Sequence, residues 1–299
     1  MHVRCRSGYD GSSMTSGADF SVRGLERKPV VVGYDGSENA RKAVLWASRY
    51  AAVAHLPLMV VHAWIWPYFT QNLGPVAGIK DSGLRREAQR VVTEGRDLAV
   101  RSEPDLPVHQ RLVIGFPSKT LTEFSREASL LVIGTRGLGG FAGLLIGSVS
   151  FHLAASADCP VMVVREARPT RDILLVGVDG STESDQAVLF AANLALTLRK
   201  HVQLLHVQPH PKDPRPATAR EEEAAVLDRA AALLKGHPEV HYTRDSVVAV
   251  SVPGEIVQWS HNAACVVLGA KGGNTLGARL GSTAHAVLHH SRGNVVVVR

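Results

Sequence analysis

Cysteine is scarce in this sequence, and long apolar runs are absent. The three cysteines, Cys5, Cys159 and Cys265, are scattered without a C-x-x-C pair. This excludes a disulfide framework and a cysteine-type zinc site, and it favours a reducing, cytoplasmic location. No run of about 18 uncharged apolar residues occurs, so we expect no transmembrane helix. The arginines near the N-terminus are not followed by an apolar core, so we expect no secretory signal.

Aromatic residues are also few, at 5% of the 299 residues, and charged residues make up 20%, whereas 45% are apolar. Such a composition is typical of a folded globular protein, and the length favours two domains. The net charge of +6 raises the question of a nucleic-acid partner. However, the basic residues are scattered and form neither a basic helix nor a platform for stacking bases. We therefore expect neither nucleic acid nor a membrane among the partners.

The chain contains one pattern twice. The segment 30–37, Val-Val-Val-Gly-Tyr-Asp-Gly-Ser, recurs at 174–181 as Leu-Leu-Val-Gly-Val-Asp-Gly-Ser. Further along, the segment 131–137 recurs at 266–272, which indicates a duplicated domain rather than an array of short repeats. We predict a disordered extension at 1–28, a first repeat at 29–165, a linker at 166–171 and a second repeat at 172–299.

Within each repeat, short apolar runs alternate with longer amphipathic segments. This alternation predicts α/β domains with a parallel sheet, and the Val, Ile and Leu runs are typical of strands buried on both faces. A mixed α+β domain is the alternative. The predicted strands are 30–34, 57–63, 108–114, 130–134 and 160–164, then 173–178, 201–207, 240–250, 265–269 and 294–298. The helices predicted in the first repeat are 38–54, 80–102, 118–128 and 147–157.

A glycine-rich loop follows the strand at 130–134. It starts at Gly134-Thr135-Arg136-Gly137 and ends at Gly147-Ser148, with nine residues between Gly137 and Gly147. Glycines let the backbone approach a phosphate closely, and the N-terminal amides of a helix opening at Gly147-Ser148 would favour an anion. In open α/β sheets, ligands lie beyond the carboxyl ends of the strands, where this loop would lie. The alternative is a loop whose glycines serve flexibility alone.

Asp35, at the end of the first strand, would lie in the same crevice. Its carboxylate could accept a hydrogen bond from a ribose hydroxyl, but Asp-Gly-Ser is also good chemistry for a turn before a helix. The sequence contains no Walker A loop, no G-x-G-x-x-G after the first strand and no G-x-S-x-G elbow. We find no convincing catalytic set and no cluster spaced as metal ligands, so we predict no catalytic residue and no metal site.

The duplicated region resembles a tandem universal stress protein. The family motif G-x2-G-x9-G-[ST], found in ATP-binding members, is matched by Gly134, Gly137, Gly147 and Ser148. The resemblance implies two tandem open parallel five-stranded sheets of order 3-2-1-4-5, with helices on both faces, in a Rossmann-like fold. It also implies ATP as the ligand, with Mg²⁺ bound through the phosphates, and further assembly into a homodimer.

The resemblance assigns a set of ATP-binding residues to each repeat. In the first repeat they are Gly33, Asp35, Gly36, Gly115, Gly134, Thr135, Arg136, Gly137, Gly140, Gly147, Ser148 and Val149. In the second they are Gly177, Asp179, Gly180, Gly269, Lys271, Gly272, Gly281, Ser282 and Thr283.

The second repeat departs from the family pattern. Only eight residues separate Gly272 from Gly281, Lys271 replaces Arg136, and Asn294 stands where the first repeat has proline. We therefore expect the first repeat to bind ATP more tightly than the second.

Three functions follow from these observations. The first is an ATP-binding regulatory module of the stress response, acting on an unknown protein partner. The second is a slow Mg²⁺-dependent ATPase or nucleotide hydrolase, and the third is a nucleotide-free interaction protein. The aromatic segment 64–69, Trp-Ile-Trp-Pro-Tyr-Phe, is either a lid or packing element or a docking surface for that partner.

Overall fold

The computed structural model describes residues 27–64, 83–137, 145–210, 217–272 and 280–299. The predicted N-terminal extension therefore lies almost entirely outside the described residues, as do Gly140 and all of the aromatic segment after Trp64. Within the described residues, no helix is both long and apolar enough to cross a membrane.

The strands follow the predicted ranges closely in both repeats, and so do the helices of the first repeat, where helix ranges were predicted. The first repeat contains β1 (Val30–Gly33), α1 (Glu38–Val53), β2 (Leu58–Trp64), α3 (Gly83–Ser102), β3 (Val108–Ile114), α4 (Pro117–Ser125), β4 (Leu130–Gly134), α5 (Ser148–Ser156) and β5 (Val161–Val164). The second contains β6 (Ile173–Gly177), α6 (Thr182–Leu198), β7 (His201–Pro209), α7 (Ala217–Leu234), β8 (Tyr242–Ala249), α8 (Val252–Trp259), β9 (Ala263–Gly269), α9 (Ser282–His290) and β10 (Asn294–Val298).

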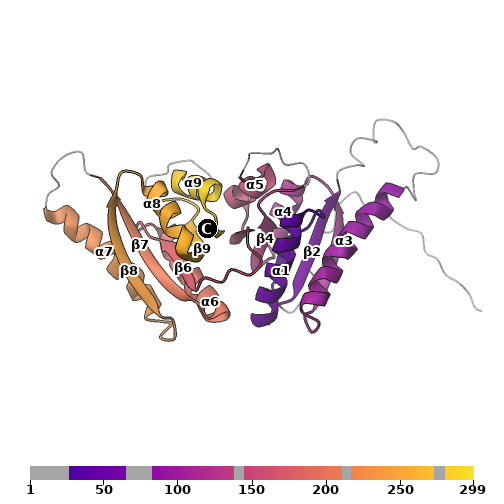
Figure 1. The fold of residues 1–299 in the computed structure, drawn as a ribbon, viewed down its shortest axis with the longest axis horizontal. Coiled ribbons are helices and arrows are strands. Elements are labelled where there is room, and N and C mark those ends of the chain that lie inside the picture. The colour runs from indigo at the N-terminus through magenta and orange to yellow at the C-terminus, as the bar shows by residue number, and fades with distance from the viewer. Residues whose placement is uncertain (1–26, 65–82, 138–144, 211–216, 273–279) are drawn as a thin grey trace, which may run out of the picture.

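The two repeats share one continuous sheet. The strand order is β3-β2-β1-β4-β5-β10-β9-β6-β7-β8, so each half has the predicted order 3-2-1-4-5. The two predicted five-stranded sheets are joined edge to edge, because β5 and β10 pair antiparallel, with Val163 opposite Val295 and Val161 opposite Val297. The halves therefore stand side by side, related by an approximate two-fold arrangement about this seam (Figure 1).

Helices cover both faces of the sheet because successive strand residues point to opposite sides. Val30 and Val32 belong to the core cluster that includes residues of α1, α3, α6 and α7, whereas Val31 belongs to the cluster on the other face, which includes residues of α4, α5, α8 and α9. The prediction that the strands are buried on both faces is confirmed for the inner strands but is wrong for the segments 108–114 and 240–250. These segments form β3 and β8 at the two outer edges of the sheet, where most of their side chains are partly or fully exposed.

The side chain of Asn294 fixes the linker to the seam. It is fully buried, and its Oδ1 accepts hydrogen bonds from the backbone N–H groups of Arg165 at 2.8 Å and Glu166 at 2.9 Å. Its Nδ2 donates to the carbonyl of Glu166 at 3.0 Å. The departure from Pro160 of the first repeat thus has a structural reason, because a proline at this position could make none of these bonds.

Arginines at the ends of β5 and β10 reach across the seam in both directions. Arg165 donates to the carbonyl of Leu288 in α9 at 2.5 Å, and Arg299 donates to the carbonyl of Ala155 in α5. These carbonyls lie at the C-terminal ends of helices, where a cation is favourable. Burial lowers the pKa of Arg165 to about 10, because the charged guanidinium is largely removed from water.

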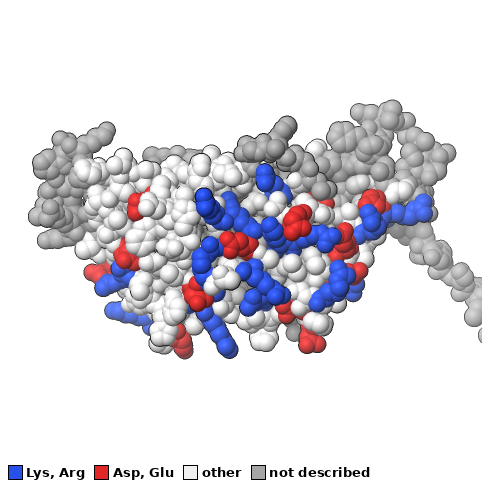
Figure 2. Space-filling model, viewed as in Figure 1, with Lys and Arg blue, Asp and Glu red and all other residues white. Residues whose placement is uncertain are grey.

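The positive charge is not gathered into one continuous surface on the face shown in Figure 2. Basic and acidic side chains are interspersed there, and they are denser over the half that carries α1 and α3 than over the other half (Figure 2).

Candidate functional site

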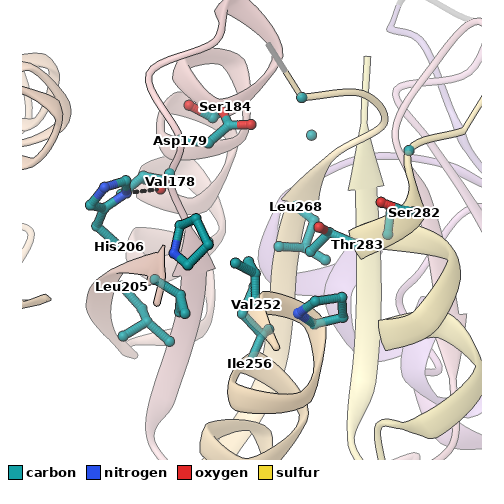
Figure 3. A pocket seen from close by; sticks show the side chains of 18 of the residues that line it. Val178, Asp179, Ser184, Leu205, His206, Val252, Ile256, Leu268, Ser282 and Thr283 are labelled. Atoms are coloured by element: carbon teal, nitrogen blue, oxygen red, sulfur yellow. Dashed lines mark hydrogen bonds between the residues drawn. The ribbon is translucent and has the colours of Figure 1, made fainter. Parts of the chain in front are cut away.

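Each repeat has a cavity at the carboxyl ends of its central strands. The cavity of the second repeat measures 730 Å³, and that of the first measures 130 Å³. Sites for small ligands usually measure about 300–1,000 Å³, and of these two cavities the one in the second repeat falls within that range. In Figure 3, Asp179 and Ser184 lie on one side of this cavity, Ser282 and Thr283 on the other, with Val252 and Ile256 below them.

The structure brings most of the predicted residues to these cavities. In the second repeat, all predicted residues except Gly180 line the cavity: Gly177, Asp179, Gly269, Lys271, Gly272, Gly281, Ser282 and Thr283. In the first repeat, the lining includes Gly33, Asp35, Gly134, Arg136, Gly137 and Val149. The predicted residues Gly36, Gly115, Thr135, Gly147 and Ser148 are not part of that lining, and Gly140 lies outside the described residues.

The Asp-Gly-Ser segments form turns that start the first helix of each repeat. The Oδ1 of Asp35 accepts from the N–H of Ser37 at 3.0 Å, and Gly36 has a φ of +86°, which a glycine adopts without strain. The hydroxyl oxygen of Ser37 then accepts from the N–H of Ala40 at 3.2 Å and caps α1. The turn interpretation of Asp35 is therefore confirmed, and Gly36 acts through its backbone conformation.

The same turn recurs in the second repeat, where Ser181 donates from its N–H to Asp179 at 3.0 Å. Gly180 has a φ of +79°. The other carboxylate oxygen of each aspartate faces the glycine loop, because a Cβ added to Gly137 or Gly272 would overlap it. The turn therefore orients one carboxylate oxygen while the other lies against the loop.

Gly134 and Gly269, the first glycines of the two motifs, have a packing role. A Cβ on Gly134 would lie 2.6 Å from the backbone of Asn39 in the first turn of α1. A Cβ on Gly269 would lie 2.8 Å from the backbone of Glu183 in α6. Each strand end therefore touches a helix backbone, which leaves no room for a side chain.

The helices that follow the glycine loops begin at a glycine. Gly147 and Gly281 are the N-cap residues of α5 and α9, with extended backbone conformations. Their N–H groups donate at 2.7 Å to the carbonyls of Thr135 and Ala270, which fixes where each helix starts. Because glycine has no side chain, no capping oxygen from this position occupies the first amides of the helix, which suit an anion. Thr135 thus contributes its backbone carbonyl to the start of α5, and its side chain is buried.

Each repeat has one histidine near the end of its second strand, and the histidine is hydrogen-bonded to the residue that follows the first strand. The Nδ1 atoms of His62 and His206 donate at 2.8 Å to the carbonyls of Tyr34 and Val178. Both histidines also line their cavities (Figure 3). Behind the first cavity, Tyr34 donates to Glu94 at 3.0 Å, and burial together with this carboxylate raises the pKa of Tyr34 to about 12.

Sequence reasoning missed the apolar walls of the second cavity. Val226 of α7 and Val252 and Ile256 of α8 line it, together with Leu268 of β9. These residues belong to elements far apart in the sequence, and their apolar character does not distinguish them from core residues. Gln208 and Pro209 also line this cavity. The sequence could have indicated them only through their position at the end of a strand.

The described residues contain no group of three His, Cys, Asp or Glu side chains that could hold a metal ion. Burial raises the pKa of the Cys159 and Cys265 thiols to about 12, so neither is poised as a nucleophile.

Two α/β repeats joined by an antiparallel seam, each with a strand-end cavity beside a glycine-started helix, define a tandem protein of the open parallel-sheet class. The sequence profile of the universal stress protein family matches residues 26–165 and 170–299. The chain belongs to this family.

A curated relative agrees with this assignment, and a solved structure shares the fold. Universal stress protein Rv2005c of Mycobacterium tuberculosis is 34% identical over 288 residues, covering 90% of this chain and 96% of that protein. The crystal structure of a universal stress protein from Archaeoglobus fulgidus covers 92% of this chain and 99% of its own, with a TM-score of 0.69 at 18% identity. A universal stress protein solved in complex with cAMP is 27% identical over 46% of this chain, with a TM-score of 0.37. The shared fold is shown by the match to the Archaeoglobus fulgidus structure, which covers most of both chains.

Proposed function

We propose that this protein is a cytoplasmic ATP-binding module that regulates a protein partner in response to stress. The observation that carries the proposal is the second cavity of 730 Å³, which is lined by Gly269, Lys271, Gly272 and the start of α9 at the carboxyl ends of the strands. The apolar wall suits a base, and the amides of α9 with the Lys271 ammonium suit a triphosphate. Mg²⁺ would be held mainly by phosphate oxygens and water.

The path from ligand to partner would run through α5 and α9. Both helices begin at a strand-end cavity, and they contact each other across the seam, where the rings of Phe151 and His285 lie 4.8 Å apart. A ligand that draws either helix toward its phosphates would change this contact. Such a difference in contacts between two states is what a ligand needs to shift their populations.

The sequence and the cavity volumes favour different repeats as the tighter ATP-binding site. The motif spacing favours tighter binding in the first repeat, whereas the volumes of 130 and 730 Å³ favour the second. We propose the second repeat as the stronger site, because a ligand entering the first would have to widen its cavity at a cost in free energy.

Replacing Ser282 with proline is expected to weaken ATP binding at least tenfold. Ser282 is the first residue of α9, where proline is compatible with a helix, and the extended conformation of Gly281 suits a residue before proline. The substitution removes one N–H donor to the phosphates, and a hydrogen bond to a charged group contributes about 1.5–3 kcal/mol. Isothermal titration calorimetry with Mg²⁺-ATP would measure the change.

One matched variant serves as the control for this experiment, and a second compares the ATP affinities of the two repeats. Ser282→Ala retains the N–H and is expected to bind within about threefold of the wild type, since only a hydroxyl is lost. Ser148→Pro makes the equivalent change in α5. If Ser148→Pro costs more affinity than Ser282→Pro, the first repeat is the stronger site. If the wild-type protein shows no heat of binding at millimolar ATP, the proposed function is wrong.

A further inference from the structure

A third cavity lies between the repeats, on the face of the sheet that carries α4 and α5. This interdomain groove measures 560 Å³, and its charged and titratable lining consists of Lys119, Glu123, Arg126, His152, Lys271 and Arg299. The first four belong to the first repeat and the last two to the second. It shares only Lys271 with the strand-end cavity of the second repeat.

Cations dominate the interdomain groove. Lys119, Arg126, Lys271 and Arg299 bring four positive charges to it, against the carboxylate of Glu123. The Oε2 atom of Glu123 is buried and accepts no hydrogen bond from the described residues. Outside the lining, Asp158 lies 3.5 Å from Arg126 and offsets part of its charge. The groove therefore retains a net positive potential, which its recessed shape would focus.

Two of the four cations, Lys119 and Arg126, are not a remnant of the duplication, whereas Lys271 and Arg299 have basic counterparts in the other repeat. Aligned through the prolines that start α4 and α8, Lys119 corresponds to Glu255 and Arg126 to Asn262. The equivalent helix surface of the second repeat thus has an acid and an amide where the first has two cations. The cations are specific to the side of the molecule where the groove lies.

We propose that the interdomain groove binds a condensed inorganic phosphate. Four cations contributed by both repeats around one recess match a chain of linked phosphates, which carries several negative charges in a short length. The volume of 560 Å³ lies within the range of about 300–1,000 Å³ typical of small-ligand sites. The groove shares only Lys271 with the ATP site proposed in the second repeat, and its other three cations lie outside both strand-end cavities.

Titration of the full-length protein with inorganic tripolyphosphate tests this proposal. Lys119→Gln removes a cation and is expected to weaken binding about fivefold, whereas Glu123→Gln removes the opposing charge and is expected to tighten it about threefold. Opposite shifts from two substitutions on one helix are not produced by a general loss of folding. Calorimetry at low ionic strength gives both dissociation constants.

Two control variants locate the site. Lys42→Gln removes a cation from α1, on the opposite face of the sheet, and is expected to leave the affinity unchanged. Ser282→Pro alters the strand-end cavity and leaves the lining of the groove unchanged, so a change in tripolyphosphate affinity with this variant reports binding in the strand-end cavity. The proposal is overturned if the wild type does not bind tripolyphosphate. It is equally overturned if Ser282→Pro abolishes binding while Lys119→Gln and Glu123→Gln match the wild type.

Discussion

Replacing Asn294 with leucine is expected to lower the free energy of unfolding by about 4 kcal/mol. The substitution removes three hydrogen bonds at a fully buried position. It leaves the N–H groups of Arg165 and Glu166 without their acceptor, and each unsatisfied buried donor costs about 1–3 kcal/mol. Leucine has a similar size, so the loss reports on the polar bonds rather than on a cavity.

Urea unfolding followed by circular dichroism measures this effect, with Asn193→Leu as the matched control. Asn193 is exposed on α6 and bonds only within its own helix, to Leu189. The control is expected to change the free energy of unfolding by no more than about 0.5 kcal/mol. Similar losses in the two variants would show that the buried amide does not fix the linker to the seam.

Alanine at Gly134 or Gly269 is expected to destabilise the protein by about 2–3 kcal/mol in each case. The added Cβ meets helix backbone at 2.6 Å from Asn39 or 2.8 Å from Glu183, and backbone cannot rotate away as a side chain can. Forcing extra atoms into a packed region costs about 1–3 kcal/mol. The measurement is again the midpoint of urea unfolding, without nucleotide.

Gly281→Ala separates packing from binding. A Cβ on Gly281 would find its nearest neighbour at 3.5 Å, and the backbone there is extended, so stability is expected to remain within about 1 kcal/mol of the wild type. If Gly269→Ala proves as stable as Gly281→Ala yet loses ATP binding, the first glycine of the motif serves the ligand and not the helix contact.

The periodicity of the sequence predicts most of the elements, and nearly all the site residues predicted in the second repeat line its cavity. The Asp-Gly-Ser turn and the glycine starts of α5 and α9 could also be predicted, because their chemistry is local. The joined sheet could not be predicted, since the pairing of β5 with β10 depends on how the surfaces of the two repeats fit. The unequal cavity volumes also depend on side chains from elements far apart in the chain.

The seam has a consequence for how the protein behaves on dilution. Two separate subunits held by the strand pair and the other contacts of the seam would come apart as their concentration fell, but segment 166–171 joins the repeats and makes the same contacts intramolecular. A short tether corresponds to an effective concentration in the millimolar range, whatever the amount of protein in the cell. Since β5 and β10 are already paired with each other, a homodimer of this chain would have to form through another surface. The paired arrangement of the two repeats would then be maintained even at very low protein abundance.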